Sequence, residues 1–245
     1  MDRLLIFDIG LHKGYDSEFY LKKGFRVVAL EAAPALCEQS SKRLAHWISS
    51  GRLQIVSRAL SERDNEQVAF YLNPEKDDWG SIFRGAAEKG VGAAIQIEVK
   101  TITLSTLFNT FGVPYYLKCD IEGADSLLVR QLLADGRRPV HVSIEANEPA
   151  DFDLLAACGY TSAQLVNQWM HPFVVCPNPS REGQFVQASF NGETSGLFGR
   201  ELDPDKWVSL PEAKRRFDNW KSLRLLDERL APGWVDVHVR CDANL

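Results

Sequence analysis

The segment that decides the fold lies near the start of the chain and reads Phe7-Asp8-Ile9-Gly10-Leu11-His12-Lys13-Gly14. An apolar run that begins at Leu4 leads into it, and a second apolar run ends at Glu31, about 20 residues further on. A strand, a glycine-bearing turn and a helix, with an acid at the end of the next strand, are typical of a nucleotide site. The acid can accept hydrogen bonds from both ribose hydroxyls.

The turn itself selects among nucleotide cofactors. A dinucleotide turn carries glycines at its first, third and sixth positions, so that a pyrophosphate can approach the backbone N–H groups. Here His12 occupies the third position and Tyr15 the sixth. Asp8 would repel a phosphate, whereas S-adenosylmethionine (SAM) carries a sulfonium and an ammonium that a carboxylate attracts. The segment therefore predicts SAM. A nicotinamide-dependent reductase is the alternative, because it shares the strand, the turn and the ribose acid.

The composition is that of a globular protein. Of the 245 residues, 45% are hydrophobic and 25% are charged, which argues against wholesale disorder. A net charge of -5 disfavours nucleic acid as a partner, because phosphate binding relies on clusters of Lys and Arg. No apolar stretch approaches the roughly 20 residues that span a bilayer. The 5 cysteines show no paired spacing, so we expect reduced thiols and a soluble, cytoplasmic protein.

Apolar, strand-like runs alternate with helical patterns along most of the chain. The expected strands are residues 3–9, 26–31, 53–59, 115–120, 140–145 and 160–166, and the expected helices are 17–23, 34–49, 124–133 and 151–157. Runs this rich in Val, Ile and Leu are typical of a parallel sheet covered on both faces. They predict an α/β fold with a doubly wound, mostly parallel sheet and a ligand at the carboxyl ends of its strands. Residues 234–239 alternate and predict a late antiparallel strand.

Two segments depart from this alternation of strands and helices. Within residues 67–103, two runs alternate as exposed antiparallel strands do, and we expect this insertion to flank the cofactor site. Residues 169–233 combine scattered aromatics with a charged helical stretch. We interpret 1–168 as a SAM-binding core, 169–233 as a cap over the substrate region, and 234–245 as a strand that returns to the core. The aromatics of the cap either wall the substrate pocket or fill the core.

A lysine and two carboxylates mark the end of a central strand. Period-two geometry places Lys118, Asp120 and Glu122 on one side of the extended chain. Burying three unpartnered charges costs several kcal/mol, so they pair with one another or bind a ligand. In the structural interpretation, Lys118 pairs with Asp120, and Glu122 complements the dipole of the following helix. In the catalytic one, Asp120, Glu122 or a Lys118 of depressed pKa is the general base.

A metal-assisted variant uses oxygen ligands from two neighbouring strands. Asp120 after one strand, with Glu145 and Asn147 after the next, would suit Mg²⁺ or Ca²⁺. The alternative is that Asn147 caps the helix that begins near Pro149. Our primary interpretation assigns no metal.

Taken together, these motifs resemble the FkbM family of SAM-dependent methyltransferases. The resemblance is carried by the opening motif with Glu31, by the string from Lys118 to Asp125 and by the strand at 140–145. It implies a class I methyltransferase fold, SAM as donor, and transfer to a hydroxyl oxygen of a small-molecule, sugar or lipid-like acceptor. A non-catalytic protein that retains this fold is a further alternative.

The resemblance also implies site residues. It assigns cofactor contacts to Asp8, Gly10, His12, Gly14, Glu31, Ala59, Ser61 and Asp120. Asp120, with Lys118 and Glu122, would form the catalytic group at the methyl-transfer pocket. The chain departs from the family at Leu11 and His12, where a small residue and Asn are usual.

Overall fold

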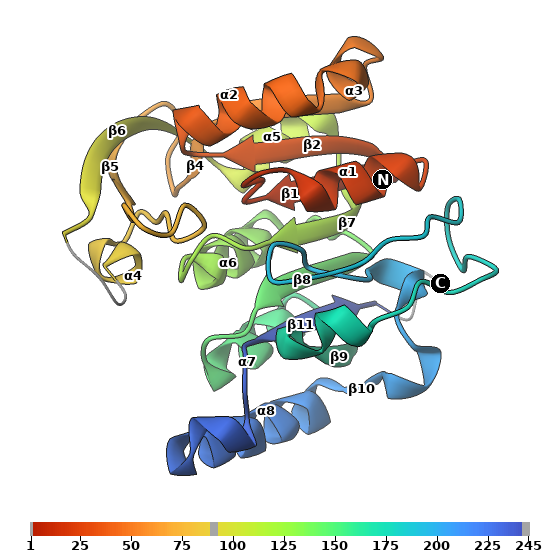
Figure 1. The fold of residues 1–245 in the computed structure, drawn as a ribbon. Coiled ribbons are helices and arrows are strands. Elements are labelled where there is room, and N and C mark those ends of the chain that lie inside the picture. The colour runs from red at the N-terminus through yellow and green to blue at the C-terminus, as the bar shows by residue number, and fades with distance from the viewer. Residues whose placement is uncertain (1, 89–92, 242–245) are drawn as a thin grey trace.

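The computed structural model describes residues 2–88 and 93–241. Its middle layer is an eight-stranded sheet (Figure 1). In spatial order the strands are β10 (Val208–Ser209), β9 (Ser162–Asn167), β11 (Val235–Arg240), β8 (His141–Glu145), β7 (Pro114–Cys119), β1 (Asp2–Ile9), β2 (Arg26–Glu31) and β3 (Leu53–Ser57). The strands from β8 to β3 pair in parallel, whereas β11 runs antiparallel to β8 and β9. The predicted α/β, mostly parallel sheet with a late antiparallel strand is confirmed.

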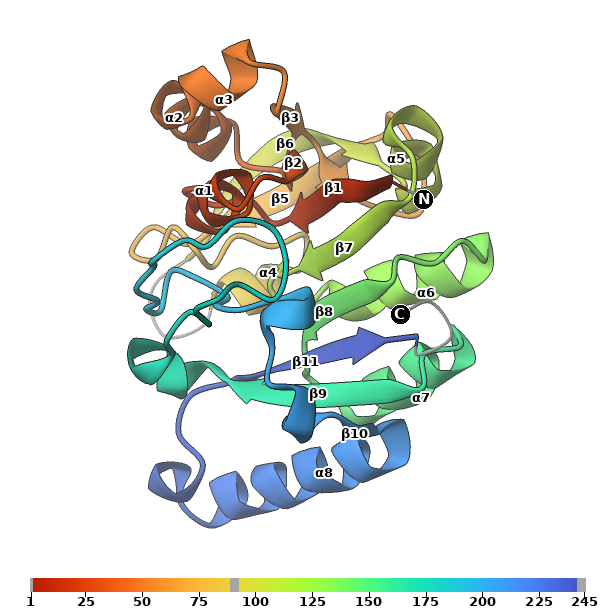
Figure 2. The same ribbon diagram turned by 90° about the vertical axis from the view of Figure 1, so that its right-hand side faces the viewer.

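The central strands are apolar throughout because helices cover both faces of the sheet. Phe7 and Ile9 of β1 join the hydrophobic cluster on one face, and Ile6 joins the cluster on the other. Helices α5 (Leu104–Phe111), α6 (Asp125–Asp135), α7 (Pro149–Ala157) and α8 (Leu210–Leu226) cover the first face, and α1 (Tyr15–Lys22), α2 (Pro34–Arg43) and α3 (Ala45–Ser49) cover the second (Figure 2). None of the helices in the described ranges is both long and apolar enough to cross a membrane.

The predicted strand 53–59 is wrong at its end. The main sheet keeps only residues up to Ser57, because the partner strand β2 ends at Glu31 and the next residues, Ala59 and Leu60, pair with Thr101 and Ile102 instead. The chain then enters a second, three-stranded sheet of β4 (Ala59–Leu60), β6 (Ile95–Ile102) and β5 (Gln67–Leu72). The antiparallel pairing of β5 with β6 is as predicted for the insertion, which also holds α4 (Arg84–Ala87). Residues 89–92 of the insertion lie outside the described ranges.

Two helices also differ from the prediction. The expected helix 34–49 is divided at Leu44, whose side chain is buried between α2 and α3. Helix α5 was not expected, although Leu104, Leu107, Phe108 and Phe111 have the i, i+3, i+4, i+7 spacing of an amphipathic helix. Its first turn is closed by Thr103, whose side chain accepts a hydrogen bond from the N–H of Thr106.

The segment 169–233 packs in two places. Its first part, which includes η1 (Gln168–Phe173) and η2 (Gly199–Glu201), covers α1, where the ring of Phe198 lies 4.7 Å from that of Tyr20. Its second part includes η3 (Pro204–Lys206), α8 and η4 (Glu228–Leu230), and Phe217 of α8 is buried in the core. Trp169 and Phe173 remain largely exposed. The division into core, cap and returning strand stays a prediction, and residues 242–245 of that strand lie outside the described ranges.

The buried His238 on β11 predicts acid sensitivity of the fold. Burial, with His141 and His171 nearby, lowers the pKa of His238 to about 3 from 6.5. Between these values the unfolded chain binds a proton that the folded chain excludes, so the free energy of unfolding should fall as the pH drops below about 6.5. His238→Gln should remove about 1.4 kcal/mol per pH unit of this slope between pH 4 and 6, as measured by urea unfolding. The same change at the exposed His46 should leave the slope unaltered.

Candidate active site

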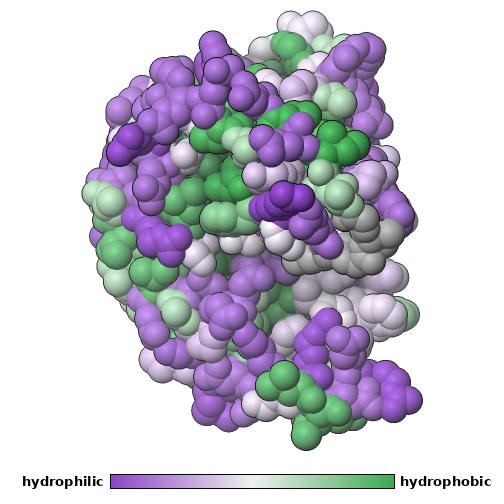
Figure 3. Space-filling view, turned by 90° about the vertical axis from the view of Figure 1, so that its left-hand side faces the viewer, coloured by the Kyte–Doolittle hydropathy of each residue, from purple (hydrophilic) through white to green (hydrophobic). Residues whose placement is uncertain are grey.

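A cavity of about 390 Å³ lies at the carboxyl ends of the parallel strands. Its volume is in the usual range for small-molecule pockets. Figure 3 looks onto this face, where hydrophobic side chains gather among hydrophilic ones. Residues from β2, β7, β8 and β11 line the cavity together with the turn after β1, the insertion and the 192–195 loop. This is the location expected for a ligand of a doubly wound sheet.

The glycine turn after β1 forms part of the floor. Gly10 has a φ of 94°, and a Cβ there would overlap the carbonyl oxygen of Asp120. Only glycine therefore lets this turn approach the end of β7, and Gly10 lines the cavity as predicted. Gly14, in contrast, precedes α1 with a φ of 74° and does not line the cavity.

A buried ammonium lies beneath this turn. The Nζ of Lys118 is 3.3 Å from Asp8, 3.3 Å from Asp16 and 3.7 Å from Asp120, and it donates a hydrogen bond to the carbonyl of Gly10. Burial favours a lower pKa, but the three carboxylates outweigh it and raise the pKa of Lys118 well above its ordinary value. The expectation of a depressed pKa is wrong, because Lys118 is held as a cation and not as a free base.

Asp16, and not Asp8 as the sequence suggested, lies at the cavity. Asp8 is fully buried, accepts a hydrogen bond from Ser17 at 2.6 Å and does not line the cavity. Asp16 does line it, and also accepts the N–H of Ser195 at 2.8 Å. Sequence analysis missed Asp16 because an acid in the first turn of a helix is common. The available signal was its position in the first turn of the helix that follows the glycine turn.

Glu31 lies at the end of β2, as predicted for a ribose-binding acid. One carboxylate oxygen accepts the N–H of His12 at 2.8 Å, and the other accepts the N–H of Ala33 at 2.9 Å. Burial raises the pKa of Glu31, and these two hydrogen bonds oppose the rise. Each oxygen keeps acceptor capacity for a ligand hydroxyl. The ring of His12 also lines the cavity and lies 3.1 Å from Asp77 of the insertion.

The side of the cavity near β2 and the insertion is apolar. Ala59 lines it, together with Leu36, Phe70, Leu72 and Ile82. Ser61 does not reach it, since the backbone of this residue is engaged by Ile102 and Gln131. The insertion thus flanks the cavity, as the sequence predicted.

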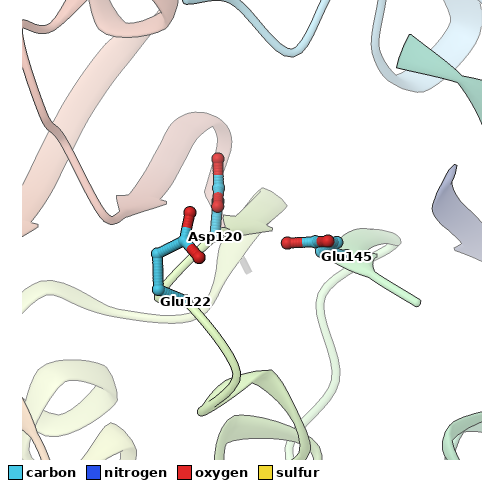
Figure 4. Close-up of side chains that lie close together, drawn as sticks. All are labelled: Asp120, Glu122 and Glu145. Atoms are coloured by element: carbon cyan, nitrogen blue, oxygen red, sulfur yellow. The ribbon is translucent and has the colours of Figure 1, made fainter. Parts of the chain in front are cut away.

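The other side of the cavity is acidic. Carboxylate oxygens of Asp120, Glu122 and Glu145 lie within 4.8 Å of one another (Figure 4). Asp236 of β11, which the sequence analysis missed, lines the same region, and burial together with Asp120 and Glu145 raises its pKa well above the ordinary value. The feature that could have revealed Asp236 is a carboxylate within a strand that is buried on both faces. Asn147 does not line the cavity.

Two further polar residues complete the description of this region. Gln168, also missed, is buried and lines the cavity, and its side-chain N–H₂ group has no hydrogen-bond partner within the described ranges. The cap of α7 is Glu148, in a capping box with Asp151, so the expected cap at Asn147 is wrong.

This donor set fits SAM. The cofactor has a cationic methionine end and a flat, apolar adenine, and the cavity offers carboxylates on one side, apolar side chains on the other and Glu31 on β2 near the apolar side. The buried N–H₂ of Gln168 is an unused donor for the carboxylate or the acceptor.

The methyltransferase FkbM domain model matches residues 8–174, which is more than half of the chain. The chain belongs to the FkbM methyltransferase family. It is therefore a SAM-dependent methyltransferase with S-adenosylmethionine as its expected cofactor, and the reductase alternative is not supported. A comparison with curated proteins gives no match.

Several solved structures are similar over nearly the whole chain. Precorrin-6y C5,15-methyltransferase from Geobacter metallireducens has 12% identity and a TM-score of 0.42, with 98% of this chain and 82% of that one covered. A SAM-dependent methyltransferase from Archaeoglobus fulgidus has 8% identity and a TM-score of 0.41, covering 97% and 86%. A putative sarcosine dimethylglycine methyltransferase from Galdieria sulphuraria has 9% identity and a TM-score of 0.41, covering 98% and 79%. Similarity at this level adds nothing about the substrate.

Removal of the buried ammonium should destabilise the FkbM-family protein. Lys118→Met would leave Asp8 and Asp16 buried without their cation, and we expect a loss of about 3–5 kcal/mol in the free energy of unfolding, measured with urea. Lys42→Met is the matched control, because Lys42 pairs with Glu38 on the surface and is 74% exposed. Its effect should stay within about 0.5 kcal/mol. Equal stability of the two variants would contradict the structural role of Lys118.

Proposed function

We propose that this methyltransferase acts on a hydroxyl oxygen of a small-molecule acceptor, such as a sugar or a lipid-like compound. The supporting observation is the acidic side of the cavity, where Asp120, Glu122, Glu145 and Asp236 can accept hydrogen bonds from hydroxyl groups. A hydroxyl acceptor must lose its proton during the reaction, so a carboxylate near the reacting oxygen is useful.

SAM, when bound, supplies an electrophilic methyl group. In our proposal Glu31 holds the ribose hydroxyls, Ala59 and the apolar insertion side chains hold the adenine, and Gly10, Asp16 and Asp120 bound the methionine end. Asp8 and Gly14 do not contact SAM in this proposal and act indirectly. Asp8 positions Lys118, and Gly14 precedes the first residue of α1. Lys118 in turn fixes the carbonyl of Gly10 at 3.1 Å.

The chain contributes mainly by positioning, which supplies most of the acceleration in a displacement of this kind. Asp120 is the candidate general base, since its side chain is 46% exposed at the cavity and lies 3.7 Å from the ammonium of Lys118. Glu122 sits in the left-handed region with a φ of 47°, a strained conformation that aims it at the same space. Gln168 can orient the acceptor through its unused N–H₂ group.

The acidic lining also favours a small molecule over nucleic acid, because phosphates would be repelled at the cavity. All five cysteines are free thiols, which is consistent with a reducing compartment, and we place the reaction in the cytoplasm.

Loss of the ribose acid should weaken cofactor binding. Glu31→Gln keeps the size of the side chain but removes its charge, so we expect about 10- to 100-fold weaker SAM affinity by isothermal titration calorimetry. Glu38→Gln, on the exposed side of α2, should bind SAM as the wild type does. Equal affinity of Glu31→Gln and wild type would refute the placement of the ribose.

The acceptor oxygen can be tested directly. Purified protein with methyl-labelled SAM and a panel of sugars and hydroxylated lipids should yield a methyl ether, identified by mass spectrometry and NMR. Asp120→Asn should lower the rate about 100-fold or more, whereas Asp153→Asn on the surface of α7 should not. Methylation only at nitrogen or carbon, or an unchanged rate in Asp120→Asn, would contradict this assignment.

A further inference from the structure

Two segments that are far apart in the sequence meet at the turn after β1. Asp77 lies in the insertion between β5 and α4, and Glu193 lies in the 192–195 loop. The Nζ of Lys13 is 3.2 Å from Asp77 and 2.8 Å from Glu193. The ring of His12 lies 3.1 Å from the second carboxylate oxygen of Asp77. Two consecutive residues of the turn therefore hold both segments.

These contacts lie at the edge of the cavity. His12, Asp77 and Glu193 line the cavity, whereas Lys13 does not. With the pairs formed, the turn, the insertion and the 192–195 loop are joined along one part of the cavity edge. Separation of the pairs would widen the opening to the cavity at this place.

The backbone of the turn is the fixed member of this arrangement. The N–H of His12 donates to Glu31, and its carbonyl accepts the hydroxyl of Ser40 at 2.8 Å. The carbonyl of Lys13 accepts the Nε–H of Arg43 in α2 at 3.0 Å. These bonds tie the turn to the end of β2 and to α2 without help from the ion pairs. Loss of the pairs would therefore release the insertion and the loop, and not the turn.

The pairs are strong enough to be formed at neutral pH and weak enough to open. Partial burial would raise the pKa of Asp77, but hydrogen bonds from His12 and Lys13 outweigh it and lower the pKa. The hydrogen bond to Glu193 raises the pKa of Lys13. Asp77 is 54% exposed and Glu193 is 42% exposed, so salt screens both pairs and each shifts an equilibrium only a few-fold. This suits a closure that opens in every catalytic cycle.

We propose that His12 and Lys13, paired with Asp77 and Glu193, form a clasp that closes the cavity over bound SAM and slows its release. The proposal rests on the placement of SAM proposed above, but not on the identity of the acceptor. Glu31 links the clasp to the cofactor, because the carboxylate that would hold the ribose also accepts the N–H of His12. A bound ribose therefore steadies the residue that holds Asp77.

The test is the rate of SAM dissociation from the full chain without acceptor. Stopped-flow tryptophan fluorescence at several SAM concentrations gives this rate, because Trp79 and Trp234 line the cavity. Lys13→Met removes the charge but keeps an apolar stem, and we expect dissociation about 3- to 10-fold faster than in the wild type. Lys13→Arg keeps the charge and should restore the rate to within about twofold.

Salt and a matched control distinguish the clasp from a general loss of structure. About 0.5 M KCl should speed dissociation from the wild type but not from Lys13→Met. Lys22→Met is the control, since Lys22 pairs with Glu18 on α1 and is 51% exposed, and it should release SAM as the wild type does. Glu193→Gln should speed dissociation and should add little to Lys13→Met in the double variant, because both remove the same pair.

Hydrogen exchange of the protein without SAM gives a second readout. The amides of residues 75–79 and 192–195 should exchange faster in Lys13→Met than in the wild type, while those of β1 should not. Unchanged dissociation in Lys13→Met, or an equal change in Lys22→Met, would overturn the clasp. The two proposals fail separately, because Glu31→Gln tests the placement of the ribose and the acceptor panel tests the methylated oxygen.

Discussion

The buried ammonium of Lys118 is the interaction on which the site depends. It joins Asp8 on β1, Asp16 on α1 and the carbonyl of Gly10 in the turn between them, and it extends from β7. Because a buried cation is tolerated only with close partners, these groups are held in one arrangement. The glycine turn, the first helix and the end of β7 are therefore fixed together before any ligand binds.

From this centre the cavity divides into two chemical environments. Toward β2 and β3, the apolar side chains of the insertion close over Ala59 and leave Glu31 as the acid beside them. Toward β8 and β11, carboxylates gather because the ends of neighbouring strands meet at the same edge of the sheet. In our proposal, SAM, which is cationic and partly aromatic, lies across the boundary between these two environments.

Much of the fold could be predicted from pattern. Buried strands are continuous apolar runs, so β1, β2, β7 and β8 were located to within a residue or two, and the alternation of the insertion revealed β5 and β6. Helix α5 could also have been found this way, because Leu104, Leu107, Phe108 and Phe111 have a helical period and Thr103 is a good cap, but our sequence analysis missed it. The end of β3 was hidden, because the apolar run continues into Ala59 and Leu60, which pair with β6 and not with β2.

For the site, the sequence by itself determined the glycine turn, Glu31, and the charged end of β7, because each is encoded within a few consecutive residues. Only the tertiary structure decided that Asp8 is an internal partner of Lys118, while Asp16, Gln168 and Asp236 reach the cavity. It also decided that Asp236 faces Glu145, far away in the chain. The physical reason is that burial and charge pairing depend on which strands become neighbours, and that information is not local in the sequence.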